Sequence, residues 1–218
     1  MKVETVVIGM FAAQSHIVVD PATNDCAIID TGESGEGIEE AVRKLGASAK
    51  LVLLTHGHLD HAGGLARVRR AFPAIPIVMC KHDLTWVENL PRQGLMFGVR
   101  LEPAPPPDRF VEDGEEIALG DLRLRTIYTP GHTEGGVTFF AEKQRVAFVG
   151  DTLFQGSIGR TDLPGGSLHT LLKSIRERLF PLGDDVRCYT GHGPSTTIGK
   201  ERLHNPFLRP GAEEELEG

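Results

Sequence analysis

Thr55-His56-Gly57-His58-Leu59-Asp60-His61 places three imidazoles and one carboxylate within six residues of a 218-residue chain that has nine histidines in all. Imidazole and carboxylate ligands together suit borderline cations such as zinc, iron or manganese. Clustered without a cation, these side chains would leave buried polar groups unsatisfied. We therefore favour a metal site over the alternative, a polar loop whose histidines share no role.

The segment before this run is a short apolar stretch, residues 50–54, and predicts a buried strand that ends where the ligands begin. In an extended chain His56 and His58 point to the same side, because they are two residues apart. A turn after His58 would direct Asp60 and His61 to a neighbouring position. One run of sequence can therefore serve two metal ions.

The composition is that of a soluble globular enzyme, with 40% apolar residues, 24% charged residues and 26 glycines. We expect a single domain over residues 1–210 and a disordered acidic tail over 211–218. The formal charge of −7 argues against a nucleic-acid partner, which normally needs a basic face. The composition gives no indication of the oligomeric state.

The three cysteines are far apart in the sequence and lie in or beside apolar runs, which indicates buried thiols rather than disulfides or a Cys-x-x-Cys metal site. No stretch reaches the length of a membrane span, and the N-terminus has no long apolar segment of a signal peptide. We therefore expect a cytoplasmic protein with no membrane partner.

Two similar sets of strands, each accompanied by helices, make up the predicted fold. The first set consists of strands at 3–8, 17–20, 26–30, 50–54 and 75–79, with helices at 36–45, 65–71 and 82–87. The second consists of strands at 116–119, 122–128, 137–140, 145–149 and 186–189, with helices from Ser167 through Phe180 and at 199–203. Two sheets flanked by helices predict a four-layer αββα sandwich of the α/β (α+β) class.

Residues 88–109 join the two halves and contain two glycines and a proline-rich stretch, Pro103-Ala-Pro-Pro-Pro107. We expect this segment to be irregular, because its prolines and glycines interrupt both helix and strand patterns. It is either a surface spacer or a loop that gates the site.

Three further polar residues follow predicted strands on glycine-flanked turns, namely His132, Asp151 and His192. A turn of this kind holds a side chain rigidly and leaves room for a metal ion and a substrate. Each signal alone is weak, since a histidine near glycine is usually an ordinary turn residue. Added to the first run, the three supply the ligands that two cations would otherwise lack.

In this order, His-x-His-x-Asp-His, Pro-Gly-His-Thr, Gly-Asp-Thr-Leu-Phe and Gly-His-Gly-Pro resemble the metallo-β-lactamase-fold superfamily over nearly the whole chain. The stretches 150–166 and 197–207 are similar to small bacterial glyoxalase II-like hydrolases. The resemblance implies two metal sites with a bridging carboxylate. Their ligands would be His56, His58 and His132 for the first ion, Asp60, His61 and His192 for the second, and Asp151 for both.

The resemblance also implies a reaction, the hydrolysis of a small thioester such as S-lactoylglutathione by a hydroxide shared between two divalent cations. Zinc is the first choice of metal, and iron or manganese would suit the same ligands. Asp60 and Asp151 would be the catalytic carboxylates. Asp30, Thr55 and Asp162 are candidates to support the ligands, and Arg160 would either bind an acidic substrate group or form an ion pair with Asp162 or Glu134.

Several departures keep other activities open. A full glyoxalase II has a C-terminal helical extension with basic residues for glutathione, and the chain ends soon after Gly-His-Gly-Pro. The most common zinc β-lactamases have a cysteine where this chain has Asp151, which argues against antibiotic hydrolysis. Gly159-Arg-Thr-Asp162 is similar to persulfide dioxygenases, which hold a single ferrous ion. The alternatives are therefore a persulfide dioxygenase acting on glutathione persulfide, a lactonase or other ester hydrolase, and a metal-binding module without catalysis.

Overall fold

The computed structural model describes residues 1–209. The predicted acidic tail, 211–218, lies outside the described residues, and the assignment of 1–210 to a single domain stays a prediction. None of the helices within residues 1–209 is long and apolar enough to cross a membrane.

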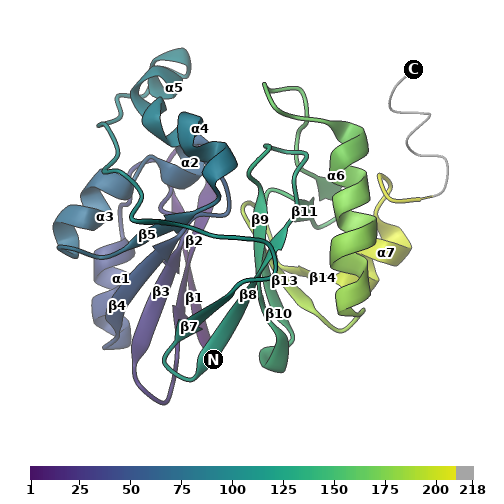
Figure 1. The fold of residues 1–218 in the computed structure, drawn as a ribbon, viewed down its shortest axis with the longest axis horizontal. Coiled ribbons are helices and arrows are strands. Elements are labelled where there is room, and N and C mark those ends of the chain that lie inside the picture. The colour runs from purple at the N-terminus through teal and green to yellow at the C-terminus, as the bar shows by residue number, and fades with distance from the viewer. Residues whose placement is uncertain (210–218) are drawn as a thin grey trace.

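The fold consists of two six-stranded sheets that face each other, with helices on the outer face of each (Figure 1). The first sheet has the order β1 (Lys2–Ile8), β2 (Ala13–Val19), β3 (Asp25–Ile29), β4 (Ser48–Leu53), β5 (Ile77–Met79) and β6 (Arg109–Phe110). The second has the order β14 (Thr196–Thr197), β13 (Arg187–Thr190), β10 (Val146–Gly150), β9 (Val137–Ala141), β8 (Leu122–Tyr128) and β7 (Glu116–Leu119). The predicted αββα sandwich is confirmed.

The helices cover the two outer faces and one end of the sandwich (Figure 1). Along the first half they are α1 (Ile38–Leu45), α2 (Leu59–Ala62), α3 (Leu65–Ala71), α4 (Leu84–Glu88) and α5 (Leu90–Met96), with a 3₁₀ turn η1 (Lys81–Asp83) before α4. The second half has α6 (Leu168–Ser174) and α7 (Ile198–His204), a 3₁₀ turn η2 (Glu142–Gln144) and a small hairpin of β11 (Leu153–Phe154) and β12 (Ser157–Ile158).

Side-chain alternation along the strands divides the core into three layers. On β3, Cys26 and Ile28 pack towards α1 and α3, whereas Ala27 and Ile29 pack between the two sheets. Successive side chains of a strand point to opposite faces, so a strand buried on both faces is apolar throughout. Fully burying one such isoleucine contributes about 1.5–3 kcal/mol relative to leaving it exposed. The central layer therefore fixes the two sheets against each other.

The helix predicted from Ser167 is confirmed, including its start. The Ser167 side chain accepts a hydrogen bond from the backbone N–H of Thr170 at 3.2 Å, which satisfies one of the free donors of the first turn. The helix continues beyond α6 as a π-helical turn, η3 (Ile175–Leu179), and a 3₁₀ turn, η4 (Phe180–Leu182). Its apolar face packs on the second sheet.

The prediction that 88–109 is irregular is wrong for its first part, which forms α5. Pro91 lies in the first turn of this helix, where a missing N–H costs nothing. Gly94 lies inside the helix, and a Cβ there would overlap the carbonyl oxygen of Val99. Both residues therefore allow the helix, although such residues usually interrupt one. The sequence also gave no indication of the short helix α2 within the ligand run.

The buried-thiol prediction is confirmed for all three cysteines, which are free and buried. Burial raises the pKa of the Cys26 and Cys188 thiols to about 12.

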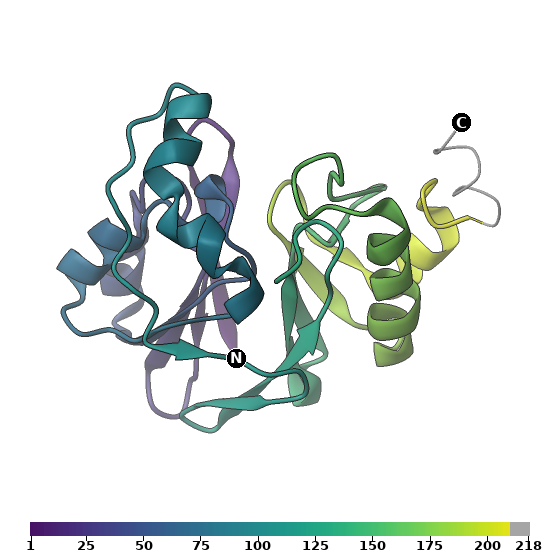
Figure 2. The same cartoon turned by 45° about the horizontal axis from the view of Figure 1, so that its top comes forward.

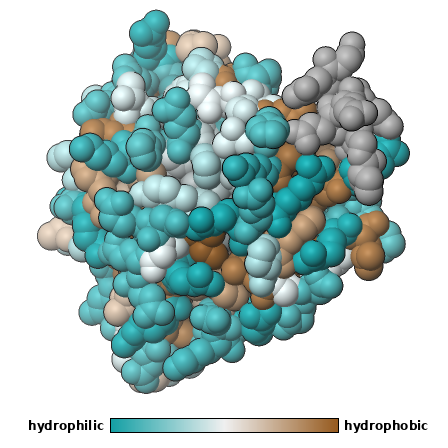
Figure 3. All heavy atoms as spheres, turned by 45° about the vertical axis from the view of Figure 1, so that its right-hand side comes forward, coloured by the Kyte–Doolittle hydropathy of each residue, from teal (hydrophilic) through white to brown (hydrophobic). Residues whose placement is uncertain are grey.

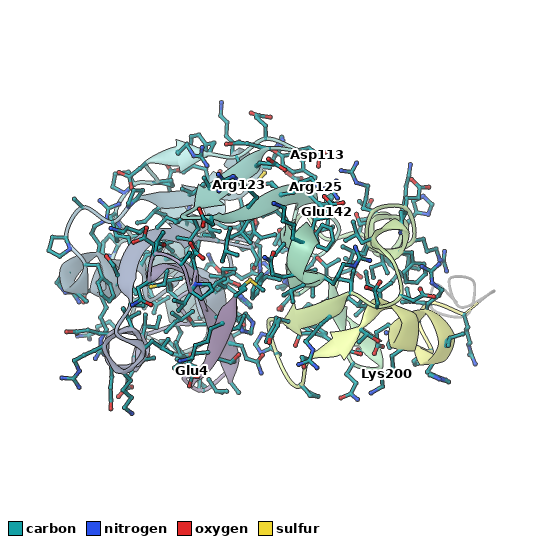
Figure 4. All side chains as sticks on the ribbon, turned by 90° about the horizontal axis from the view of Figure 1, so that it is seen from below. Glu4, Asp113, Arg123, Arg125, Glu142 and Lys200 are labelled. Atoms are coloured by element: carbon teal, nitrogen blue, oxygen red, sulfur yellow. The ribbon has the colours of Figure 1, made fainter. Side chains whose placement is uncertain are left out.

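Seen from the side of α6 and α7, most of the surface is hydrophilic with apolar residues interspersed (Figure 3). Seen from below, Glu4 of β1 and Lys200 of α7 lie near the lower edge of the view, and Arg123 of β8 lies in its upper half (Figure 4).

The strand directions place the functional residues at one end of the sandwich. β3 and β4 are parallel, and so are β10 and β13. Within each sheet the carboxyl ends of parallel strands meet at one edge, so the loops after β3 and β4 lie together and so do the loops after β10 and β13. Figure 2, in which the top of the molecule comes forward, shows these loops of the two halves facing each other.

Candidate metal centre

The structure brings together all seven residues that the sequence singled out as ligands. Residues 1–209 contain three groups of potential ligands, and within each group the ligand atoms lie within 4.8 Å of one another. These groups are His56, His58 and His132; Asp60, His61 and His192; and His56, His61 and Asp151. Asp151 thus lies beside both of the predicted triplets.

Four backbone segments position these side chains. His56 and His58 lie in the loop after β4, and His61 lies one turn further on in α2. His132, Asp151 and His192 each follow a strand of the second sheet, namely β8, β10 and β13. The two sheets therefore contribute to the cluster jointly, and their packing sets its geometry.

Two of the imidazoles are fixed by a hydrogen bond at the outer nitrogen, the ring nitrogen that points away from the centre of the cluster. Nδ1 of His132 lies 2.7 Å from the carbonyl oxygen of Arg160, and Nδ1 of His192 lies 3.1 Å from the carbonyl oxygen of Phe11. A carbonyl oxygen only accepts, so in both rings Nδ1 carries the hydrogen. The lone pair is then on Nε2, which faces the centre of the cluster.

Asp30 and Thr55 fix two more imidazoles. The Asp30 carboxylate is buried and accepts hydrogen bonds from the backbone N–H of Thr55 at 2.7 Å, the Thr55 hydroxyl at 2.7 Å and Nδ1 of His61 at 2.9 Å. Because the Thr55 hydroxyl hydrogen goes to Asp30, its oxygen accepts from Nδ1 of His56 at 3.1 Å. Both candidates therefore hold a site histidine by its outer nitrogen, as metal-binding histidines are usually held.

The nitrogen and oxygen atoms that face the centre of the cluster offer lone pairs to a cation. Nε2 of His56 and Oδ1 of Asp151 are buried without a hydrogen-bond partner. Nε2 of His61 lies 3.3 Å from Oδ1 of Asp151, and Nε2 of His192 lies 3.2 Å from Oδ2 of Asp60, with only lone pairs between them when the rings are neutral. Such convergence of acceptors is costly unless a positive charge lies among them.

The electrostatics of the cluster agree with this interpretation. Burial lowers the pKa of His56 well below its ordinary value and lowers the pKa of His58 to about 3, so both rings are neutral near pH 7. Burial also disfavours a charged His61, but the carboxylates of Asp151, Asp60 and Asp30 outweigh it and raise the pKa of that ring well above its usual value. The centre therefore attracts positive charge, either as protons or as metal ions.

Gly191 allows the backbone to approach the centre closely. A Cβ at this position would overlap Oδ1 of Asp151 and lie 2.7 Å from Cε1 of His61. A side chain there would therefore displace the carboxylate that lies beside both triplets.

Asp83 is a site residue that the sequence analysis missed. It is fully buried, and its carboxylate accepts hydrogen bonds from the N–H of Gly57 at 2.9 Å, the hydroxyl of Thr133 at 2.8 Å and the N–H of Gly135 at 2.7 Å. Burial raises the pKa of this carboxyl, although the three donors oppose that shift. Asp83 ties the loop of His56 and His58 to the loop of His132.

Gln93, on α5, was also missed because its segment was expected to be irregular. Its side-chain oxygen accepts from the N–H of Leu59 at 3.0 Å, and its nitrogen donates to the carbonyl oxygens of Gly57 at 3.2 Å and Trp86 at 2.8 Å. Only the helical pattern of 90–96 could have suggested that this side chain points inward. The helix therefore supports the ligand run.

Arg160 and Asp162 contribute differently from the remaining candidates. The Arg160 guanidinium forms two hydrogen bonds with the Asp162 carboxylate, both at 2.7 Å, and both side chains are exposed. The ion pair that we kept as an alternative is therefore present. It is the carbonyl of Arg160, not its side chain, that contacts His132.

A cavity of about 710 Å³ opens over the cluster. Its floor contains His58, Asp60, His132, Asp151 and His192. One wall is formed by α4, α5 and the turn after β1, and the other by residues 160–165. The volume is within the range of small-molecule sites, about 300–1,000 Å³.

Comparisons with known proteins show what the chain is similar to. The model of the metallo-β-lactamase superfamily matches residues 9–192. The chain is 40% identical over 209 residues to hydroxyacylglutathione hydrolase GloC of Haemophilus influenzae, covering 95% of this chain and 98% of the relative.

Two solved structures share its fold at 32% identity. The first, BLEG-1, described as a B3 metallo-β-lactamase, has a TM-score of 0.88 over 95% of this chain and 99% of its own. The second, TTHA1623 in a di-iron-bound form, has a TM-score of 0.86 over 94% of this chain and all (100%) of its own.

Proposed function

The chain belongs to the metallo-β-lactamase superfamily, and we propose that it is a metal-dependent hydrolase of the glyoxalase II type that cleaves small thioesters. The observation that carries this proposal is the convergence of seven candidate ligand side chains, five of which line the floor of one cavity, with the outer nitrogens of four histidines held by acceptors. The relative named hydroxyacylglutathione hydrolase supports an S-lactoylglutathione-like substrate.

We assign two divalent cations to the cluster, most simply zinc. The neighbour described in a di-iron-bound form supports two ions and makes iron the first alternative. When bound, the cations would supply a Lewis acid and would lower the pKa of water to about 7. The assigned ligands are His56, His58 and His132 for the first ion, Asp60, His61 and His192 for the second, and Asp151 for both.

The protein's own residues would orient the reactants. Asp60 has one oxygen 3.2 Å from Nε2 of His192, and its other lone pairs can accept a hydrogen bond from the attacking water. Asp151, between the triplets, fixes their separation. Asp30, Thr55 and Asp83 hold the ligands and their loops in place. The departing thiolate needs little help from a general acid, because the pKa of a thiol is about 8.5.

Elemental analysis of the purified protein, together with three assays, tests this proposal. We expect two metal equivalents per chain and release of thiol from S-lactoylglutathione without uptake of oxygen. One iron per chain, with oxygen uptake on glutathione persulfide and no thioester cleavage, would instead identify a dioxygenase. A chromogenic cephalosporin is the third substrate because of the likeness to BLEG-1, and we expect it to be a poor one.

The variant Asp151→Ala tests the assignment of the bridging carboxylate. We expect it to retain at most one metal equivalent and to lose thioester cleavage. Two equivalents and full activity in this variant would contradict the role given to Asp151.

A further inference from the structure

Exposed apolar side chains are concentrated beside the mouth of the cavity. Three consecutive residues at the end of α5 have large exposed fractions: 78% for Leu95, 76% for Met96 and 43% for Phe97. Met10, in the turn after β1, is 70% exposed. Scattered exposed apolar residues are ordinary, but a contiguous group commonly marks a binding surface.

The two segments that carry these residues meet over the cavity. The rings of Phe11 and Phe97 are in edge-to-face contact with centroids 5.7 Å apart, which joins the turn after β1 to the end of α5. Both rings line the cavity, as do Met96 and Trp86 on the same wall. Trp86 in turn contacts the ring of His58 edge-on at 4.7 Å. The apolar wall, which we define as Phe11, Trp86, Met96 and Phe97, therefore runs from the rim to the cluster.

Two arginines, Arg92 and Arg160, line the cavity, and they differ in whether the guanidinium is already paired with a carboxylate. The guanidinium of Arg160 is neutralised by Asp162. Arg92, on the exposed side of α5, also lines the cavity, and within residues 1–209 it forms no hydrogen bond or ion pair. One guanidinium is therefore available to an anionic group of a ligand, and the rest of that wall offers mainly apolar contact.

From this arrangement we propose that the preferred substrates are thioesters with a bulky apolar group, which lies against the apolar wall while Arg92 pairs with a carboxylate of the thiol carrier. This inference rests on the proposed thioester hydrolysis, and it narrows the substrate class. An apolar group gains affinity in proportion to the area that it removes from water, at about 25 cal/mol per Å². A lactoyl group is too small to cover the wall.

Fluorescence of Trp86 measures binding separately from catalysis, because this is the only tryptophan of the chain and it lines the cavity. Two thioethers, S-methylglutathione and S-hexylglutathione, differ only in their apolar group and cannot be hydrolysed. We expect the hexyl compound to bind about tenfold tighter or more. Complete burial of one methylene contributes about 0.8 kcal/mol, so partial burial of the hexyl chain is enough for this difference.

Matched variants separate the two determinants. Met96→Ser should reduce the preference for the hexyl compound severalfold, whereas Arg92→Gln should weaken both thioethers to the same extent. Leu203→Ser is the control, because Leu203 has the same exposed fraction as Met96, 76%, and does not line the cavity. Steady-state kinetics with S-lactoylglutathione and S-hexanoylglutathione should show a higher kcat/KM for the hexanoyl ester.

The possible failures can be distinguished. Equal affinity for the two thioethers, or equal effects of Met96→Ser and Leu203→Ser, would overturn the inference even if thioesters are hydrolysed. If Met96→Ser changes the elution volume in size-exclusion chromatography but keeps the hexyl preference, the inference is also overturned, because the exposed apolar residues would then form an interface between copies of the chain. Retained hexyl preference without any thioester cleavage would leave the apolar pocket in place and would contradict the proposed function alone.

Discussion

Asp83→Asn is the substitution that most directly tests how the metal centre is held together. Oδ2 of Asp83 accepts from the N–H of Gly57 and the hydroxyl of Thr133, and Oδ1 accepts from the N–H of Gly135. An amide has one oxygen and one NH₂ group. In its better orientation the amide keeps the first two bonds and places its NH₂ group against the N–H of Gly135.

The expected cost follows from this count. One buried N–H loses its acceptor, which costs about 1–3 kcal/mol, and the two remaining bonds lose their charge assistance, so the free energy of unfolding should fall by about 2–4 kcal/mol. The loops of His56, His58 and His132 would also lose their common anchor. Loss of such a supporting partner typically weakens metal binding about 10–100-fold.

Asp20→Asn is the matched control for this measurement. Asp20 is also buried and accepts three hydrogen bonds, from the N–H of Ala22, the hydroxyl of Thr23 and the N–H of Asp121. It follows β2, which is antiparallel to β3, and therefore lies at the end of the sheet opposite the metal centre.

The assay combines urea unfolding of the metal-free proteins with metal titration against a chromogenic chelator. Asp83→Asn should lose both stability and metal affinity, whereas Asp20→Asn should keep the metal affinity of the wild type. If Asp83→Asn binds metal as tightly as the wild type, or if both variants lose affinity equally, the role of Asp83 as an anchor is refuted.

Three further predictions follow from individual contacts. Burial lowers the pKa of His16 to about 4, below the unfolded value of about 6.5. Between these values the unfolded state binds a proton that the folded state does not, so the free energy of unfolding decreases as the pH is lowered. Urea unfolding of the metal-free proteins should show wild type losing about 2 kcal/mol more than His16→Gln between pH 7 and pH 5; equal losses would contradict the shift. Gly191→Ala should displace the Asp151 carboxylate and reduce the metal content measured by elemental analysis, and an unchanged content would be evidence against the close packing seen there. Thr55→Val removes the hydroxyl that orients His56 and should weaken metal binding about 10–100-fold in the chelator competition, with unchanged affinity as the contrary result.

The clustering of the candidate ligands could be predicted from the sequence because their chemistry is carried by side chains. His56, His58, Asp60 and His61 lie within six residues, and no other common reason places three imidazoles so close together. The sandwich was predictable for a similar reason, since strands such as β3 carry a continuous apolar run, here Cys26 to Ile29, when both faces are buried. Local pattern and tertiary environment agree at these positions.

The helix α5 could not be predicted, because the local pattern and the tertiary structure disagree there. Pro91 and Gly94 usually interrupt a helix, yet Pro91 falls in the first turn and Gly94 faces the carbonyl of Val99. Whether proline or glycine ends a helix depends on its position in the turn and on what packs against it. With the helix missed, the supporting role of Gln93 was missed as well.

The supporting contacts were the least predictable part of the site, because many of their atoms belong to the backbone. Asp83 binds the N–H groups of Gly57 and Gly135, and the outer nitrogens of His132 and His192 contact carbonyl oxygens. A backbone donor or acceptor has no signature in the sequence, so only the fold reveals which one faces a given ring. Arg160 illustrates the consequence: the sequence pointed to its guanidinium, but its carbonyl is the group that contacts the site histidine. The sequence therefore singles out the polar side chains that meet at this site, whereas the backbone carbonyls that orient the rings of His132 and His192 can be read only from the fold.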